Sequence, residues 1–278
     1  MLEVLQETII DGLKLIPFLF IAYLVMEYIE HKTSGKSKDY IKKSGKFGPA
    51  IGGVLGIFPQ CGFSAIAANL YAGRIITIGT LIAVFLSTSD EMLPIMISEA
   101  VPVGTILRIL GIKLVIGIIM GFVIDLIFRK KDNEEKAIEH LCEHEHCHCE
   151  EGIVKSALTH TVKIFAFIFI ISFILNTIIH FVGEETLSNL ILNKPVLGPV
   201  ISALIGIIPN CASSVILTQL YLSNVLSLAG MIGGLLVNAG VGLLVLFKVN
   251  HNLKENIKIV LGLYTISVIS AIILQFII

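Results

Sequence analysis

The chain repeats its own sequence at an offset of 150 residues. The stretch GIFPQCGFS, which begins at Gly56, returns as GIIPNCASS, and 11 of the 24 positions in 48–71 are identical in 198–221. Residues 1–128 align with 151–278 without a gap. Shared hydrophobicity does not account for a matched proline, cysteine and glycine. An internal repeat of this kind, in a chain with many apolar segments, is typical of secondary transporters.

Each repeat contains four apolar segments. Hydrophobic residues make up 55% of the chain and charged residues 15%, against about 25% charged residues in soluble proteins. Apolar runs of about 18 residues or more predict membrane-spanning helices. We therefore expect an all-α, multi-pass protein of the plasma or inner membrane. The segments cover 9–29, 48–71, 75–97 and 103–128 in the first repeat, and 160–182, 197–221, 225–247 and 256–278 in the second.

Lysines in the short loops predict that the two repeats have opposite orientations. The loop HKTSGKSKDYIKKSGK at 31–46 holds six lysines, whereas its counterpart VGEETLSNLILNK at 182–194 holds one lysine and two glutamates. The loop at 98–104 has no basic residue, whereas its counterpart at 248–258 has three lysines. Because basic loops stay in the cytoplasm, equivalent loops lie on opposite sides. We expect both termini outside the cytoplasm and the central linker inside it.

Inverted repeats need an odd number of crossings, so one of the four segments in each repeat must enter and leave on the same side. Pro59 and Pro209 interrupt the motif segments, because proline disrupts the middle of a helix. We interpret 48–71 and 198–221 as re-entrant helical hairpins whose tips meet near the bilayer midplane; a proline-kinked full span is the alternative. Each repeat then has three transmembrane helices and one hairpin, which gives ten helical segments when hairpin arms are counted separately. The first repeat covers 1–128, the linker 129–153 and the second repeat 151–278.

The hairpin tips and the third segment supply the candidate substrate path. Broken helices expose main-chain donors and acceptors, and the motifs add thiols, hydroxyls and amides. The stretch STSDEMLP adds two carboxylates that are costly inside a membrane, and Pro94 is expected to break this segment too. Lys113 would pair with one of those carboxylates or snorkel to the interface. The alternatives are that the small cysteine and serine side chains only pack between helices, and that the two carboxylates are solvated at the outer boundary of the membrane. The candidate path residues are Pro59, Gln60, Cys61, Ser64, Asn69, Ser87, Thr88, Ser89, Asp90, Glu91, Pro209, Asn210, Cys211, Ser214, Gln219 and Asn238.

The linker contains a dense group of histidines and cysteines. Such density indicates metal binding, here to Zn²⁺, Ni²⁺, Co²⁺ or Cu⁺, although no fixed zinc-finger spacing is present. The alternative is a polar linker that chelates metal incidentally. The tract has no counterpart in the repeat, so we expect it to lie off the transport path. Its candidate ligands are His140, Cys142, His144, His146, Cys147, His148 and Cys149.

The paired GxxPxC motifs, the STSDE stretch and the His-rich linker resemble the ten-helix heavy-metal exporter family, whose members are labelled arsenic efflux proteins or manganese transporters. The resemblance covers nearly the whole chain. It implies export of a cation or metalloid from the cytoplasm.

We therefore expect a secondary transporter for a Mn-like divalent transition metal or a metalloid, working by alternating access on an ion gradient. The absence of a P-loop argues against ATP hydrolysis, and no nucleophile–base pair suggests an enzyme. An oxyanion transporter and a membrane metal sensor that acts through the linker are the alternatives. We expect no required cofactor, the metal being the substrate, and a lipid bilayer as the environment. A homodimer is one option for assembly, and no nucleic-acid partner is expected.

Overall fold

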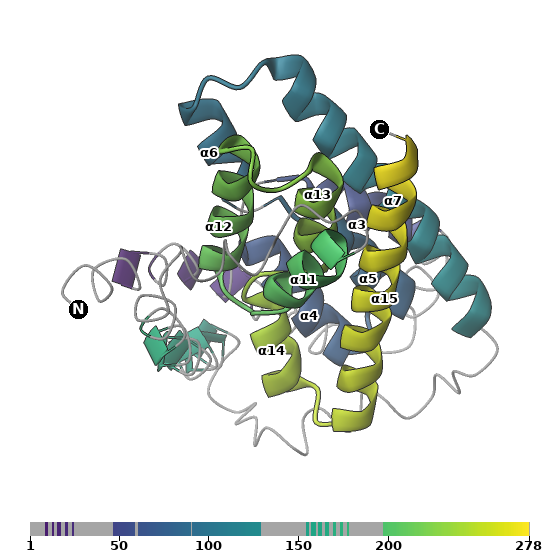
Figure 1. The fold of residues 1–278 in the computed structure, drawn as a ribbon. Coiled ribbons are helices and arrows are strands. Elements are labelled where there is room, and N and C mark those ends of the chain that lie inside the picture. The colour runs from purple at the N-terminus through teal and green to yellow at the C-terminus, as the bar shows by residue number, and fades with distance from the viewer. Residues whose placement is uncertain are drawn as a thin grey trace.

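The described part of the chain is all-helical. The computed structural model describes residues 47–58, 61–89, 91–128 and 197–277, with short groups of residues within 9–24 and 154–177. The linker and most of the first apolar segment of each repeat lie outside these residues. The helices of the first half are α3 (Gly48–Gly56), α4 (Cys61–Ala72), α5 (Ile78–Ser87), α6 (Met92–Ser98) and α7 (Val103–Phe128) (Figure 1). Those of the second half are α11 (Leu197–Gly206), α12 (Cys211–Leu222), α13 (Leu228–Val237), α14 (Gly242–Val249) and α15 (Leu253–Ile277).

The helices recur with the period of the sequence. The first residues of α4, α5, α6 and α7 each precede those of α12, α13, α14 and α15 by 150 positions. In Figure 1, α7 begins at the top of the view and descends, whereas α15 begins at the bottom and rises to the C-terminus, so the two long helices run in opposite directions. The inverted placement of the two halves in a bilayer stays a prediction.

Two broken helices form the core. In α5 and α13 almost every side chain is buried, including all residues at 79–87 and 229–237. Each continues, after a short irregular stretch, into α6 or α14. Over the combined segments Ile78–Ser98 and Leu228–Val249, 71% and 94% of the most apolar window is buried, against 33% and 28% for α7 and α15. Protein therefore surrounds the helix breaks, as free main-chain groups at membrane depth require.

The third segment is interrupted between Ser87 and Met92, within the turn before Pro94, as predicted for a proline that lacks an amide and clashes with the carbonyl four residues earlier. Pro94 is the third residue of α6. The amide of a residue in the first turn has no acceptor within its own helix, so proline is tolerated there. The corresponding break between α13 and α14 contains no proline. There Gly240 has a φ of 52°, which glycine adopts without strain, and its amide donates to Asn238 Oδ1 at 2.8 Å.

Small residues bring α3 and α11 against the central helices α5 and α13. A Cβ added to Gly56 of α3 would lie 2.3 Å from Ser87 Oγ on α5, and one added to Gly206 of α11 would lie 2.1 Å from the carbonyl oxygen of Gly234 on α13. Helices α7 and α15 cover the central helix of their own half, α5 and α13 respectively. Close approach through small residues is a frequent way for helices to associate in membranes.

The start of each central helix is held by the end of the long helix in the same half. Thr77 caps α5 and donates to Asp125 Oδ2 at 2.7 Å, while Asp125 Oδ1 accepts from the Gly79 amide at 2.8 Å. One repeat later, Ser227 caps α13 and donates to Gln275 Oε1 at 2.8 Å. The same kind of side-chain contact therefore recurs in both halves, at equivalent positions of equivalent helices.

Helices α4 and α12 each pack against the other half. Helix α4 packs against α14 of the second half, and α12 packs against α6 of the first half. The central helices α5 and α13 also contact each other. Through these contacts each half packs against helices of the other half.

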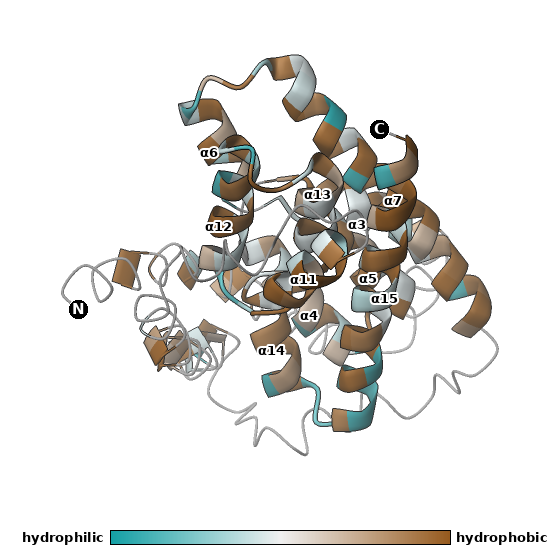
Figure 2. Ribbon diagram, viewed as in Figure 1, coloured by the Kyte–Doolittle hydropathy of each residue, from teal (hydrophilic) through white to brown (hydrophobic). Residues whose placement is uncertain are grey.

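The outer faces of α7 and α15 are apolar and exposed, as the brown ribbons of Figure 2 indicate. These helices have 26 and 25 residues with mean hydropathies of 2.4 and 2.3. At 1.5 Å per residue each is about 38 Å long, which is enough to cross a hydrocarbon core of about 30 Å. Together with the two broken segments, four helical stretches of the described residues are long and apolar enough to span a membrane.

Candidate functional site

The breaks in the four interrupted segments lie close to one another at the centre of the described fold. In the first half, the Ser89 hydroxyl, just after α5, donates to the main-chain carbonyl of Ile57, just after α3. The break in the third segment is thereby tied to the break between α3 and α4. The hydroxyl of Thr88 donates to the Val84 carbonyl within its own helix at 2.8 Å.

Asn238 makes the corresponding connection in the second half. Its Nδ2 donates to Ser213 Oγ at 2.9 Å, and Ser213 Oγ lies 2.7 Å from the carbonyl oxygen of Asn210 and 3.1 Å from that of Ile208. Asn210 caps α12 by accepting from the Ala212 amide at 3.4 Å. Asn238 therefore holds both the turn before α14 and the tip of the second hairpin.

A close approach between Ser64 and Gly242 joins the two halves at this level. A Cβ added to Gly242, the first residue of α14, would lie 2.7 Å from Ser64 Cβ and 3.0 Å from a ring carbon of Phe85. Ser64 is fully buried in the first turn of α4. The tip of the first hairpin therefore sits directly against the helix break of the second half.

Lys113 places a charge in the same region. It is completely buried near the middle of α7, so the expected alternative of snorkelling is wrong. Its Nζ donates to the main-chain carbonyl of Thr88 at the end of α5 and to that of Leu235 in the last turn of α13, the latter at 3.0 Å. The side chain thus bridges the two halves. The residue one repeat later is Leu263, which is also fully buried.

The other predicted path residues are distributed unevenly. Ser87 bonds to the carbonyls of Ala83 and Val84 in its own helix. Ser214 is buried, Pro209 is half-buried, and Glu91 is half-buried at the position before α6. Gln219 is exposed near the far end of α12, away from this cluster.

Asn69 is buried two turns from the tip, where its Nδ2 donates to the Ala65 carbonyl at 3.0 Å. Its Oδ1 accepts no hydrogen bond from any of the described residues.

Several predicted residues fall outside the described part of the chain. Pro59, Gln60 and Asp90 do so, as do all seven linker residues: His140, Cys142, His144, His146, Cys147, His148 and Cys149. Of Cys61 and Cys211 the main chain is described, and they are the first residues of α4 and α12. Within the described ranges no group of three or more histidine, cysteine or acidic residues could hold a metal ion.

Sequence reasoning did not place two residues of this centre on the path, namely Lys113 and Ser213. Ser213 is fully buried and connects three main-chain or side-chain groups, yet its counterpart in the first repeat is Phe63, so a search for shared positions passes over it. A signal for Lys113 was present, since an ionisable residue in the middle of an apolar helix is a functional candidate.

Helix ends dominate the electrostatics of the centre. The C-terminal ends of α5 and α13 offer carbonyl oxygens and a partial negative charge, and the starts of α4 and α12 offer amides and a partial positive charge. The ammonium of Lys113 lies at the C-terminal ends of α5 and α13, where the partial negative charge favours a cation. The centre can therefore hold a cation on main-chain oxygens or an anion on main-chain amides.

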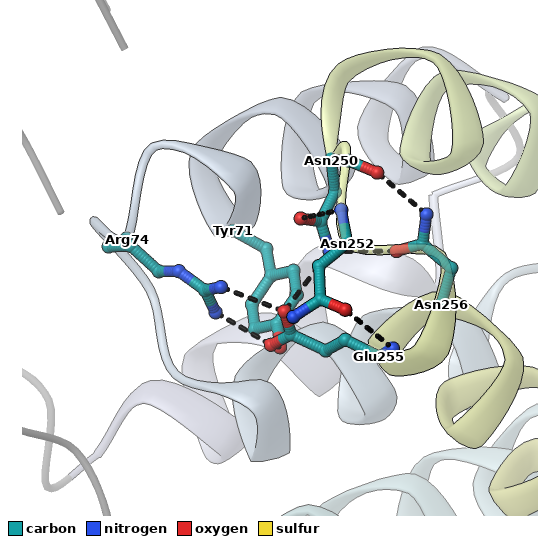
Figure 3. A network of polar contacts seen from close by, with 6 residues as sticks. All are labelled: Tyr71, Arg74, Asn250, Asn252, Glu255 and Asn256. Atoms are coloured by element: carbon teal, nitrogen blue, oxygen red, sulfur yellow. Dashed lines mark hydrogen bonds and ion pairs between the residues drawn. The ribbon is translucent and has the colours of Figure 1, made fainter. Parts of the chain in front are cut away.

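A second polar cluster joins the end of α4 to the start of α15 (Figure 3). Arg74 Nη1 and Nη2 lie 2.7 and 2.8 Å from Glu255 Oε1 and Oε2, and the Tyr71 hydroxyl also donates to Glu255 Oε1. The hydrogen bonds to Glu255 raise the pKa of Arg74 above its ordinary value, so its guanidinium stays charged. Asn250 Nδ2 donates to Asn256 Oδ1 at 2.7 Å, and Asn256 Nδ2 donates back to the Asn250 carbonyl at 2.8 Å.

This cluster joins the end of α4 in the first half to the stretch at 248–258 in the second half, for which the lysine pattern predicts a cytoplasmic position. Arg74 follows the first hairpin, and Glu255 lies in the basic stretch at 248–258. One repeat away the equivalent positions are Tyr221, Asn224 and Thr105, which carry no ion pair of this kind. The two ends of the molecule therefore differ in charge although their helices match.

No curated protein and no solved structure matches the chain. A family model does match, over residues 2–181 and again over residues 133–277, so that the two matches together include nearly every residue. The match agrees with the resemblance carried by the paired proline–cysteine motifs, and with the apolar helices of the described fold. The chain therefore belongs to the ArsP_2 family, which is described as "Putative, 10TM heavy-metal exporter".

Proposed function

We propose that the protein is a secondary transporter that exports a divalent transition metal or a metalloid from the cytoplasm by alternating access, driven by an ion gradient. The observation that carries the proposal is the meeting of four helix breaks, two from each half, in one buried polar centre. Broken helices at the midplane, contributed by two repeats, are the usual construction of transporter binding sites. Membership in a heavy-metal exporter family gives the class of substrate.

The arrangement of the halves suits alternating access. The second hairpin arms are exchanged, so that α4 rests on α14 and α12 on α6. A rocking motion of one half against the other would then open the centre first to one side and then to the other. The opposite directions of α7 and α15 support inverted halves. The 12-residue arms α4 and α12 are about 18 Å long and so too short to cross alone, which supports hairpins that turn back.

The thiols of Cys61 and Cys211 are our proposed ligands for a soft substrate. Both residues begin a helix, where the partial positive charge favours the thiolate. Arsenite and Zn²⁺ prefer such sulfur ligands, whereas Mn²⁺ prefers oxygen. For Mn²⁺ the ligands would be the carboxylates at 90–91, the amides and the freed carbonyls.

Transport by the purified protein in liposomes tests the proposal. Mn²⁺, Zn²⁺ and arsenite would be offered with and without an imposed proton gradient, and accumulation measured by elemental analysis. We expect gradient-dependent movement of at least one of them. Replacing Cys61 and Cys211 together by serine should abolish movement of arsenite or Zn²⁺ and spare Mn²⁺. Cys142→Ser in the linker is the matched control.

The amides at the starts of α4 and α12 could also bind an oxyanion. Arsenate and phosphate are therefore included among the substrates offered to the liposomes. Movement of an oxyanion and of no metal would replace the metal exporter by an anion transporter. If nothing moves, and cells without the protein keep their metal content and tolerance, the transporter proposal fails. Deleting 139–151 should leave transport intact, whereas it would silence a sensor that acts through the linker.

A further inference from the structure

The buried ammonium of Lys113 is the one charge in the described structure that joins both central helices. A full charge inside a membrane protein is very unfavourable unless polar groups surround it. Two of the groups that receive it here are the main-chain carbonyls of Thr88 and Leu235. Both are among the carbonyls at a helix end, which receive no hydrogen bond from an amide of the same helix, and both lie where the helix dipole is negative.

These carbonyls have the chemistry of a cation site. In transporters, carbonyl oxygens at unwound helix ends coordinate the transported or coupling cation, and hard divalent cations favour such oxygen ligands. An ammonium group and a metal ion therefore compete for the same oxygens.

Both halves contribute carbonyl oxygens to the site, but the ammonium group that occupies it comes from the first half alone. Lys113 extends from α7 of the first half and reaches α13 of the second. The counterpart position, Leu263, is apolar and equally buried, so no second tethered cation enters from α15. Departure of the ammonium would remove one link between α5 and α13.

We propose that the carbonyls of Thr88 and Leu235 form part of a central cation site, that the ammonium of Lys113 fills this site when no substrate is bound, and that the substrate cation displaces it. The tethered ammonium satisfies the carbonyl oxygens of the empty site, so that the unloaded protein can return. The displacement rests on the proposed export of a cation, whereas the carbonyl site itself does not.

The carbonyl site is tested by chemical rescue of the purified full-length protein. Lys113→Ala removes the side chain, and thermal unfolding is then followed with added butylammonium or with butan-1-ol at the same concentration. We expect a saturable rise in melting temperature with butylammonium that butan-1-ol does not match. Leu263→Ala opens a comparable space in the other half and should show no preference for the ammonium compound. Equal effects of the two compounds on Lys113→Ala would overturn the carbonyl site.

Displacement is tested with Lys113→Met, which keeps an unbranched side chain and serves also if the alanine variant fails to fold. The concentration of Mn²⁺ that gives half of the maximal thermal stabilisation should fall at least tenfold relative to the natural protein, while gradient-driven transport is lost. An unchanged Mn²⁺ midpoint would overturn the displacement. Selective rescue by butylammonium, with no metal bound by any variant, would retain the carbonyl site and reject the proposed export of metal.

Discussion

Arg74 and Glu255 form an ion pair between the two halves, with 2.7 Å between Nη1 and Oε1. Arg74 follows α4, which packs on α14, and Glu255 lies in the first turn of α15. Their pairing closes one end of the crossing between a hairpin arm and the other half. Because Tyr71 donates to the same carboxylate, three side chains converge on a single acidic group.

Breaking this pair should weaken the fold by a modest amount. The side chains of Arg74 and Glu255 are 37% and 21% exposed, so solvent screens part of the attraction, and a pair of this kind contributes about 1 kcal/mol. We expect Arg74→Gln and Glu255→Gln to lower the melting temperature in detergent by a few degrees each, and the double variant to lose less than the sum. Arg108→Gln, on an exposed position of α7, is the control. Full additivity of the two changes would show that the pair contributes no coupling.

The contact between α3 and α5 should not tolerate an added methyl group. In Gly56→Ala the new Cβ would meet Ser87 Oγ at 2.3 Å and the Val84 carbonyl oxygen at 2.6 Å, which forces α3 away from the central helix α5. We expect a loss of about 1–3 kcal/mol and reduced transport. Gly111→Ala on α7 has no atom within 4 Å of the new Cβ. That variant should be neutral or more stable, since alanine favours a helix more than glycine does.

Asn238 and Gln219 should respond differently to the same substitution. Asn238→Ala removes the bonds to Ser213 and to the Gly240 amide and leaves buried polar groups unsatisfied, at about 1–3 kcal/mol. Transport should fall sharply in proteoliposomes containing equal amounts of folded protein. Gln219→Ala, at an exposed position, should keep the natural rate. The assignment of the centre is wrong if both variants transport alike.

The sequence predicts the hairpin breaks because their signals are doubled. Proline, cysteine and an amide recur at one offset, and the structure interrupts the helices at 57–60 and 207–210. The second pair of breaks is harder to foresee. Pro94 indicates the break before α6, but the break at 238–241 contains no proline and depends on a glycine with positive φ and an asparagine that reaches another helix.

Lys113 shows why the centre could not be read completely from the sequence. Its position in an apolar helix indicates importance, but two of its acceptors are main-chain carbonyls, and one of these is 122 residues away. Every residue has a main-chain carbonyl, so the sequence does not indicate which carbonyls accept a hydrogen bond from a distant side chain. Ser213 was not predicted for a different reason. Its hydrogen bonds have no counterpart in the first half, so a comparison of the two repeats cannot identify it.

The caps of the central helices offer a final prediction that uses the repeat as its own control. Asp125 receives hydrogen bonds from Thr77 Oγ1 and the Gly79 amide, whereas Gln275 receives one from Ser227 Oγ. Bonds to a charged acceptor are stronger than neutral ones. Asp125→Ala should therefore destabilise the protein by about 1–3 kcal/mol, and Gln275→Ala by about 0.5–1.5 kcal/mol.

Asp125→Asn separates charge from hydrogen bonding at this cap. The amide keeps one oxygen for the Gly79 amide and resembles Gln275 in charge, so its loss should approach that of Gln275→Ala. Thermal unfolding of the four proteins under one set of detergent conditions measures the order. If Asp125→Asn is as damaging as Asp125→Ala, the negative charge itself holds the start of α5, and the neutral cap of α13 works by a different balance of forces.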